Sequence, residues 1–488
     1  MAEISEEPKF TLRLIIDEEK NKVVLAEACR DFVDVLFSLM TLPMGTIVGL
    51  LKKHQKSEIG CFSNLHNSVA EMSIDSFMTG ACKEMLLNPR SVKDADCKRL
   101  KLNLNPNDDG LKYFKCPFFS NCNKCSDFSG SDCACGSLME HEIKLTEDDD
   151  HIQNDVDGVF VSGRSSFIIT DDLKVSVDST GLVLKTLNSL GCSDVSKLGE
   201  QLLDIGLNEI MRLLECVFYS NTPLTDALLK KQSPQDMTNI HKLLLTPSCL
   251  KETKTEVSEE SEFTIDAIVR KQDTKILYVE CGEDFVDLLF SFLAVPLEYV
   301  CDTSLGCTGN LRRSFKDLTV DKRKEEGLGS KCVLPHYYKC QKQVSVITTE
   351  EAPLYYRYRN SNPRQPDYSL TRDCDRTLLY RKDRIVPVIV IDPKSPSHHG
   401  RDDNGSGFVK RGRRFTVSDD LIITTRGCLS TSICFLKKYQ IKGEDVDVHV
   451  IRIREAEVMN LLRASLGTSS ALNSALWNMI AKKPKMET

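Results

Sequence analysis

Two stretches of this sequence, FTLRLIIDEEKNKVVLAEACRDFVDVLFSLMTLP (residues 10–43) and FTIDAIVRKQDTKILYVECGEDFVDLLFSFLAVP (263–296), align without a gap, and thirteen of their thirty-four positions are identical. A second pair, FVSGRSSFIITDDLKV (160–175) and FVKRGRRFTVSDDLII (408–423), follows in the same order. Matching blocks in one order are typical of an internal repeat, which has to be recognised before the local elements are read. The sequence therefore predicts two divergent copies of one fold.

The first block of each copy predicts a β-hairpin followed by helices. Residues 11–16 and 22–28 are rich in β-branched and aliphatic residues and flank a polar turn. Asp31 is expected to cap a helix that Pro43 closes, since aspartate favours the N-cap and proline cannot continue a helix. A second short helix is expected over 45–53.

The second block predicts another hairpin, a helix, a strand and a final helix. Residues 201–205 alone are ambiguous, but their counterpart VDVHVIRIR (446–454) alternates strictly, which is typical of a strand. We therefore expect an α+β fold, a tandem duplication in which each copy consists of two small α+β halves. The expected elements of the second half are strands 166–170 and 173–177, helix 179–190, strand 201–205, helix 208–218 and a short helix in PLTDALLKK.

Composition sets the domain boundaries. Segments that are polar, charged and poor in apolar residues cannot build a core and are expected between folded units. The predicted organisation is a disordered N-terminus (1–9), a first repeat (10–249) with a cysteine-rich ribbon at 112–140, a linker (250–262), and a second repeat (263–488) with a long polar insertion at about 358–407.

Length and charge limit the class of protein. The 488 residues are too many for one compact core, and 41% hydrophobic with 28% charged residues is typical of folded globular proteins. No apolar run is long enough to span a membrane, and the acidic N-terminus does not resemble a signal peptide. We therefore expect an intracellular protein, in the cytoplasm or nucleus, whose twenty cysteines are mostly reduced.

Five cysteines within twenty residues form the motif C-x5-C-x2-C-x7-C-x-C-G, at Cys116, Cys122, Cys125, Cys133 and Cys135. The Cys122–Cys125 pair has the spacing of half a tetrahedral zinc site. Cys133 and Cys135 would supply the other half, with Gly136 permitting the turn. The surrounding polar residues cannot build a core, so a metal would explain how the segment folds.

The sequence thus predicts one structural zinc ion on Cys122, Cys125, Cys133 and Cys135, with Cys116 as the alternative ligand. A loop of exposed thiols is the competing interpretation. The second copy keeps only the start of the motif, because Tyr337-Tyr338-Lys339-Cys340 is similar in character to residues 112–116 but no cysteine pair follows.

The remaining motifs favour structural roles. The acid pairs Asp31/Asp34 and Asp284/Asp287 suit the first turn of a helix, and Asp171-Asp172 and Asp419-Asp420 suit tight turns. The basic run Lys410-Arg411-Gly412-Arg413-Arg414 could contact phosphate, yet the net charge of −7 favours a solvated loop. The sequence contains none of the common phosphate-binding, zinc-protease or serine-hydrolase motifs, so no catalytic residue is assigned.

These residues together resemble a plant-specific family known as domain of unknown function 674. The resemblance rests on DFVDVLFSLMTLP and its copy DFVDLLFSFLAVP, on GCFSNLHNSV with GCTGNLRRSF, on the YFKC…CACGSLM segment and on FIITDDLKV. It covers most of both copies and implies a plant origin and a family with no established activity. The second copy departs from it by losing the cysteine pairs.

Three functions remain open at this point. The first is a non-catalytic interaction or scaffold protein with protein partners and one structural zinc ion. The second is a nucleic-acid-associated protein that uses the ribbon and the basic loop, and the third is an enzyme of unrecognised class. The acidic character of the chain favours the first and predicts no membrane association.

Overall fold

The structure is a computed structural model. It describes residues 9–104, 112–133, 135–145, 158–163, 166–189, 191, 195–230, 263–301, 306–319, 332–335, 338, 347–349, 355–359, 368–371, 386–394, 407–425, 433, 437 and 442–481. The predicted N-terminal segment, except Lys9, and the predicted linker lie outside these residues.

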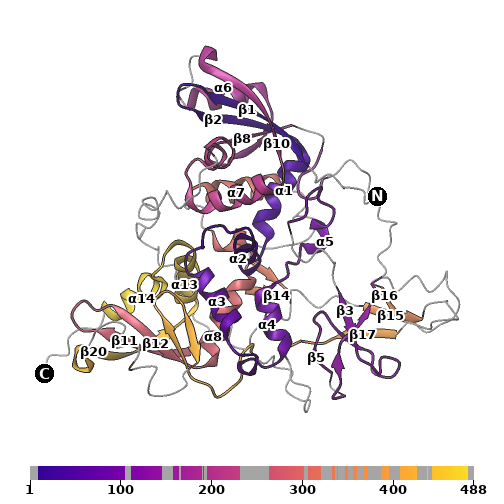
Figure 1. Ribbon diagram of the computed structural model, residues 1–488, viewed down its shortest axis with the longest axis vertical. Helices are drawn as coiled ribbons and strands as arrows, with labels where there is room; N and C mark the ends of the chain where they lie inside the picture. The colour runs from indigo at the N-terminus through magenta and orange to yellow at the C-terminus, as the bar shows by residue number, and fades with distance from the viewer. Residues whose placement is uncertain are drawn as a thin grey trace.

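We keep the names first copy and second copy for residues 10–249 and 263–488. A five-stranded antiparallel sheet in the first copy lies at the top of Figure 1. Its order is β10-β1-β2-β8-β9, so the strands of both sequence blocks form one sheet. The hairpin strand β2 pairs with β8, and β1 pairs with β10 over eight residues, from Phe10↔Ile205 to Asp17↔Leu198. The strands are β1 (Phe10–Asp17), β2 (Lys22–Ala28), β8 (Phe167–Thr170), β9 (Val175–Val177) and β10 (Leu198–Ile205).

The second copy contains a sheet of the same order, β20-β11-β12-β18-β19, at the lower left of Figure 1. Both hairpins carry the same irregularity, after Ile15 in β1 and after Ile268 in β11. The strands are β11 (Phe263–Arg270), β12 (Ile276–Cys281), β18 (Phe415–Ser418), β19 (Ile423–Thr425) and β20 (Val446–Ile453).

The α+β class is confirmed, but the two halves predicted for each copy are not separate units. Because β2 pairs with β8 and β12 pairs with β18, each sheet is assembled from both halves. An isolated two-stranded hairpin has only marginal stability and leaves backbone N–H and C=O groups at its edges without hydrogen-bond partners. Pairing with a third strand supplies those hydrogen bonds. The sequence identified the strands and could not identify their partners.

The helices of the first copy are α1 (Arg30–Thr41), α2 (Met44–Lys53), α3 (Phe62–Glu71), α4 (Gly80–Leu87), α5 (Asp94–Cys97), α6 (Thr180–Ser189), α7 (Leu207–Tyr219) and a π-helix (Thr225–Lys230). Those of the second are α8 (Glu283–Ser291), α9 (Leu297–Val300), α10 (Gly306–Leu318), α13 (Glu455–Gly467) and α14 (Ala471–Ala481). Every residue of α1 from Phe32 to Thr41 is buried, which explains why the helix is apolar on nearly all sides. Its predicted cap is wrong: the helix begins at Arg30 after Cys29, and Asp31 lies in the first turn.

A third sheet combines strands of both copies, and we call it the composite sheet. Its order is β16-β15-β17-β4-β3-β7, with β17 of the second copy parallel to β4 of the first. The two outer strands also meet, because Leu370 N donates to Lys144 O (2.9 Å) and Leu145 forms a parallel bridge with Leu370. The strands are β3 (Tyr113–Lys115), β4 (Lys124–Ser126), β7 (His141–Ile143), β15 (Tyr355–Arg359), β16 (Tyr368–Thr371) and β17 (Val386–Val390).

The composite sheet encloses a small core of its own, at the lower right of Figure 1. The core residues are Tyr113, Phe119, Cys125, Ile143, Tyr355, Leu370 and Val388. The described part of the insertion predicted at 358–407 therefore contributes buried strands, because its few apolar residues lie opposite the ribbon. The hydroxyls of Tyr113 and Tyr355 lie 2.6 Å apart in this core, whereas the Tyr338 hydroxyl donates to Met85 O.

Two short two-stranded sheets complete the described elements. One pairs β5 (Ser131–Asp132) with β6 (Leu138–Met139), and the other pairs β13 (Cys332–Leu334) with β14 (Ile347–Thr349) in parallel. The first of them carries two of the clustered cysteines on its connecting turn.

Candidate metal centre

Four cysteines gather their sulfur atoms at one point beside the composite sheet. Cys116 follows β3, Cys122 lies in the turn before β4, and Cys133 and Cys135 lie in the turn after β5. The Sγ atoms of Cys116 and Cys135 are 3.4 Å apart, those of Cys122 and Cys133 are 3.3 Å apart, and all four lie within 4.8 Å of one another. A tetrahedron with metal–sulfur bonds of about 2.3 Å has edges of about 3.8 Å, which falls within this range.

Cys125 lies apart from this cluster, and Cys116, the alternative ligand, takes the place predicted for Cys125. Cys125 is the middle residue of β4, paired with Lys115 of β3, and its side chain is buried in the core of the composite sheet. Burial there raises the pKa of its thiol. The CxxC spacing would need both cysteines on one turn, but the strand begins at Lys124, so side-chain alternation turns Cys125 toward the opposite face.

Backbone hydrogen bonds hold the two cysteine-bearing turns. The amides of Asn121 and Cys122 both donate to Phe118 O, at 2.9 and 2.7 Å. In the other turn Cys133 N donates to Ser137 O, and Gly136 N donates to Cys133 O. Gly136 has a φ of +84°, in the left-handed region that favours glycine, as the sequence predicted. Both turns are therefore defined by the backbone, and the sulfurs are held in place.

Three of the four thiols, those of Cys116, Cys133 and Cys135, differ in burial and in acidity. Burial raises the pKa of Cys116, and it raises that of Cys133 to about 11. Burial also acts to raise the pKa of the exposed Cys135, but hydrogen bonds with Ser137, Cys116 and Cys133 outweigh it and lower the pKa to about 6. One thiolate is thus available at neutral pH, and a cation placed among the sulfurs would favour ionisation of the others.

An apolar floor from both copies lies under the cluster. Cys116, Cys133 and Met139 pack together, with Phe114 of β3 and Ile391 of the second copy against them. Ile391 N donates to Cys125 O (2.9 Å), and Ile389 N donates to Asn123 O (2.9 Å). The centre therefore lies where the two copies are joined in one sheet.

The first-turn acids hold neighbouring loops. Asp34 is buried and accepts hydrogen bonds from the amides of Val159, Phe160 and Val161 at 2.7, 2.8 and 3.0 Å. Asp287 accepts from Phe408 N and Val409 N in the same way, at 2.8 and 3.0 Å. A side chain at Gly158 or Gly407 would collide with these carboxylates. Asp34 and Asp287 therefore anchor the segment that leads into β8 or β18.

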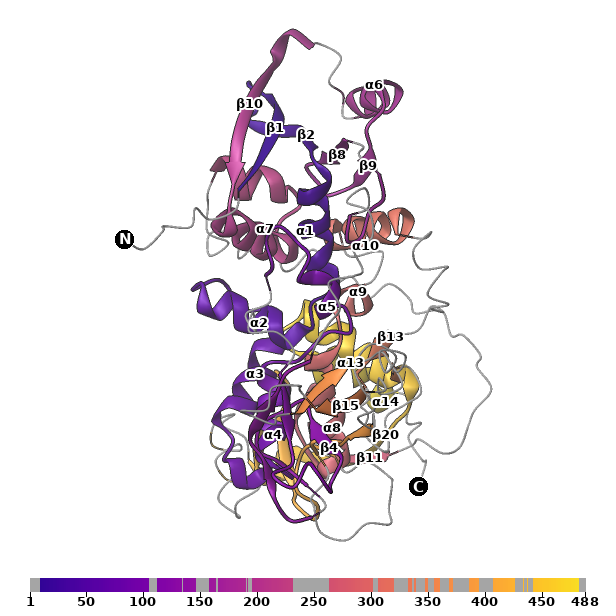
Figure 2. The same ribbon diagram turned by 90° about the vertical axis from the view of Figure 1, so that its right-hand side faces the viewer.

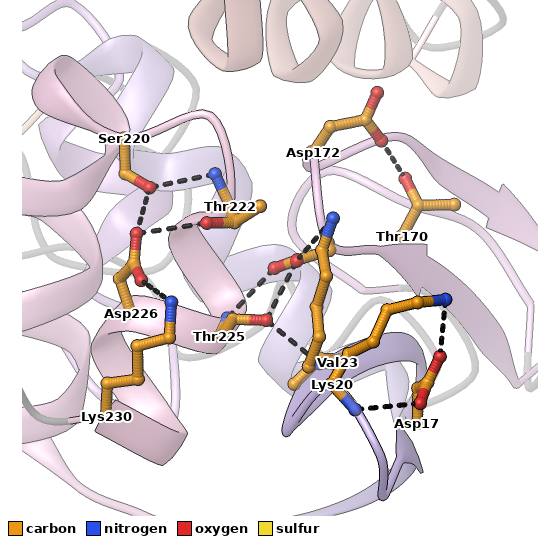
Figure 3. A network of polar contacts seen from close by, with 12 residues as sticks. Asp17, Lys20, Val23, Thr170, Asp172, Ser220, Thr222, Thr225, Asp226 and Lys230 are labelled. Carbon is orange, nitrogen blue, oxygen red and sulfur yellow. Dashed lines mark hydrogen bonds and ion pairs between the residues drawn. The ribbon is translucent and has the colours of Figure 1, made fainter. Parts of the chain in front are cut away.

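The turn acids bind the last helix of each copy. Thr225 N and Oγ1 donate to Asp171 at 2.9 and 2.8 Å, and Val23 N donates to Thr225 Oγ1 at 2.9 Å (Figure 3). The second copy repeats the chain of contacts: Asn473 N donates to Asp419 Oδ1, and Ile276 N donates to Asn473 Oδ1, both at 2.8 Å. Burial raises the pKa of both aspartates. These partners of Asp34 and of Asp171 thus lie in different segments, 159–161 and the helix that begins at Thr225.

The basic loop makes ion pairs within the chain. Arg411 contacts Asp284 (2.9 Å) and Glu283, and Arg414 lies 3.7 Å from Asp266. Arg413 donates to Ser76 Oγ and Asp75 O. Three of the four cations therefore have partners within the chain, and the contacts of Arg413 join the loop to the first copy.

The comparison with protein families gives one result. Residues 6–456 match the model described as "Protein of unknown function (DUF674)". The chain belongs to this family. The description of the DUF674 family names no activity, and neither the curated proteins nor the solved structures contain a match. Within the described ranges the structure has no helix both long and apolar enough to cross a membrane.

Sequence reasoning missed Ile391 and the strand before it as part of the centre. The signal available was the alternating VPVIVI of residues 386–391, which predicts a strand but not its partner.

Proposed function

We propose that this member of the DUF674 family is a non-catalytic interaction or scaffold protein whose ribbon holds one structural zinc ion on Cys116, Cys122, Cys133 and Cys135. Four sulfur donors within 4.8 Å carry the proposal. Thiolate ligands in a tetrahedron select zinc among the common cellular divalent ions, and a site with four protein ligands leaves no position open for catalysis.

The location of the centre supports a structural role. The two cysteine-bearing turns contain mostly polar residues, and their apolar floor is limited to Met139, Phe114 and Ile391 beside the cysteines. Zinc binding contributes folding free energy directly to such segments. A zinc ion here would stabilise the turns against which β17 of the second copy packs.

We propose further that the two halves of the chain arose by duplication. The matching strand orders, the bulges after Ile15 and Ile268, and the repeated Asp–backbone contacts support this origin. The cysteines whose side chains the structure describes are free thiols, which supports a location in the cytoplasm or nucleus. Partners are expected to be proteins, because the cations of the basic loop are engaged within the chain.

The test is metal analysis of the chain purified without chelators. The expected content is about one zinc ion per chain. Replacement by Co²⁺ should give the intense visible absorption and sulfur charge-transfer bands of a tetrahedral four-thiolate site. Metal-free protein with an unchanged fold would contradict the zinc proposal.

Partner binding is tested separately, by cross-linking the native protein in cell extracts and identifying the linked proteins by mass spectrometry. Reproducible cross-links to a defined protein are expected. Protein found only as an uncross-linked monomer would contradict the scaffold role.

A further inference from the structure

A helix of each copy packs on the sheet of the other copy. Helix α3 of the first copy lies against β19: Asn64 Nδ2 donates to Asp420 O at 2.8 Å, and Ile423 N donates to Ser68 Oγ at 2.9 Å. In Figure 2, α3 lies with α8 in the lower body, away from β1 and β2 of its own copy.

Helix α10 of the second copy makes the equivalent contacts with the sheet of the first copy. Asn310 Nδ2 donates to Asp172 O at 3.0 Å, and Val175 N donates to Ser314 Oγ at 2.9 Å. Asn310 and Ser314 are the counterparts of Asn64 and Ser68 in the repeated GCFSNLHNSV and GCTGNLRRSF segments. Figure 2 shows α10 beside α1 and β9, in the upper body. The two copies have therefore exchanged equivalent helices.

Residues at the centre of the molecule face their own counterparts. Pro43 forms an antiparallel bridge with Pro296, in which Met44 N donates to Val295 O and Leu297 N to Leu42 O, both at 3.0 Å. A residue that contacts its own equivalent lies on a two-fold axis, as in an isologous dimer.

The exchanged segments also complete the apolar cores. Phe315 of α10 packs edge-to-face on Phe37 of α1, with ring centroids 5.4 Å apart. Phe77, which follows α3, stacks on Phe290 of α8 at 6.4 Å. Phe290 is the counterpart of Phe37 in the first repeat block. Each central helix thus has an aromatic partner from the other copy, so neither copy fills its core alone.

We propose that the surface between the copies is a self-complementary dimer interface, and that the partner it fits in trans is a second molecule of this chain. One copy of a molecule can then be replaced by the same copy of another molecule through identical contacts. Domain swapping of this kind creates no new surface, since it uses contacts that the single chain already makes.

Chain connectivity determines which form is populated. A covalent link gives the two copies an effective concentration of roughly millimolar, so the closed monomer dominates when the chain is dilute. Cutting the link removes this advantage and leaves the interface alone to hold the copies together. The proposal does not depend on the zinc proposal, because the exchanged contacts involve α3, α10 and the two five-stranded sheets.

The experiment uses the full chain with a protease site placed in the 250–262 segment and cleaved after purification. Two preparations are made, one with an affinity tag on the N-terminal piece and one untagged and isotopically labelled. Each cleaved protein should elute at the size of the intact chain, with both pieces in one peak. When the two preparations are unfolded together and refolded, the tag should retain labelled and unlabelled C-terminal pieces equally.

Two variants make the result specific. Asn64→Ala combined with Asn310→Ala removes one hydrogen bond from each exchanged helix and should increase dissociation of the cleaved pieces at least about tenfold, since a hydrogen bond contributes about 1 kcal/mol. Asn188→Ala, on the exposed surface of α6, should have no effect. Cleaved pieces that separate into two folded monomers would overturn the proposal, as would equal dissociation of both variants. Circular dichroism distinguishes separation from unfolding.

Discussion

The buried carboxylate of Asp34 gives the sharpest test of whether the paired acids are structural. Replacing Asp34 with alanine leaves the amides of Val159, Phe160 and Val161 without their acceptor. A buried donor without a partner costs about 1–3 kcal/mol, so three donors, of which water can reach some, predict a loss of about 4 kcal/mol in the free energy of unfolding. This change is large compared with the total stability of a typical domain.

Asp31→Ala is the matched control, because Asp31 lies in the same helix turn but its side chain is about half exposed and, among the described residues, pairs with Arg30 at 3.6 Å. Its loss should cost less than about 1 kcal/mol. Urea unfolding followed by circular dichroism measures both. If Asp34→Ala and Asp31→Ala lose the same small amount of stability, Asp34 is not an anchor. The similar contacts of Asp34 and Asp287 would then need another explanation.

Three further changes probe the second copy and the join between copies. Burial raises the pKa of Asp287 to about 7, so the native state binds this proton more tightly than the unfolded chain does. The free energy of unfolding should therefore fall as the pH rises from about 4 to about 7. Asp287→Asn should flatten this part of the pH profile. Thr225→Val removes the hydroxyl between Val23 and Asp171 and should lower the free energy of unfolding by about 2 kcal/mol in urea titrations, and an unchanged midpoint would contradict the bridge. Ile391→Asp should loosen the composite sheet and speed amide exchange in both β4 and β17, whereas exchange confined to β17 would show that the sheet is not one unit.

Much of the secondary structure was predictable because an ambiguous segment in one repeat could be assigned from the matching segment in the other. The strand at 201–205 was identified only through the alternation of 446–454, and the structure places β10 and β20 at the same edge of the two sheets. Pairing between distant segments was not predictable. Nothing local in VPVIVI indicates that it joins β4, because strand partners are chosen by side-chain packing across the sheet.

The sequence predicted that the candidate site consists of cysteines, but it identified only some of the cysteines that come together. The spacing of Cys122 and Cys125 suggested a pair, but the strand that begins at Lys124 turns Cys125 away, and Cys116 takes its place. Cys116 lies six residues before Cys122, at the end of β3, so its approach depends on the β3–β4 pairing and not on a local turn.

The measurement that tests the account most directly is the zinc content of three proteins purified in parallel: the wild type, Cys116→Ala and Cys125→Ala. Both substitutions remove a buried thiol from the same ribbon, so both should lose some stability. The geometry predicts about one zinc ion per chain in the wild type and in Cys125→Ala, with a loss of at least about tenfold in zinc affinity for Cys116→Ala. Full zinc binding by Cys116→Ala together with loss in Cys125→Ala would contradict the assigned ligands, and a wild type without zinc would contradict the metal centre itself.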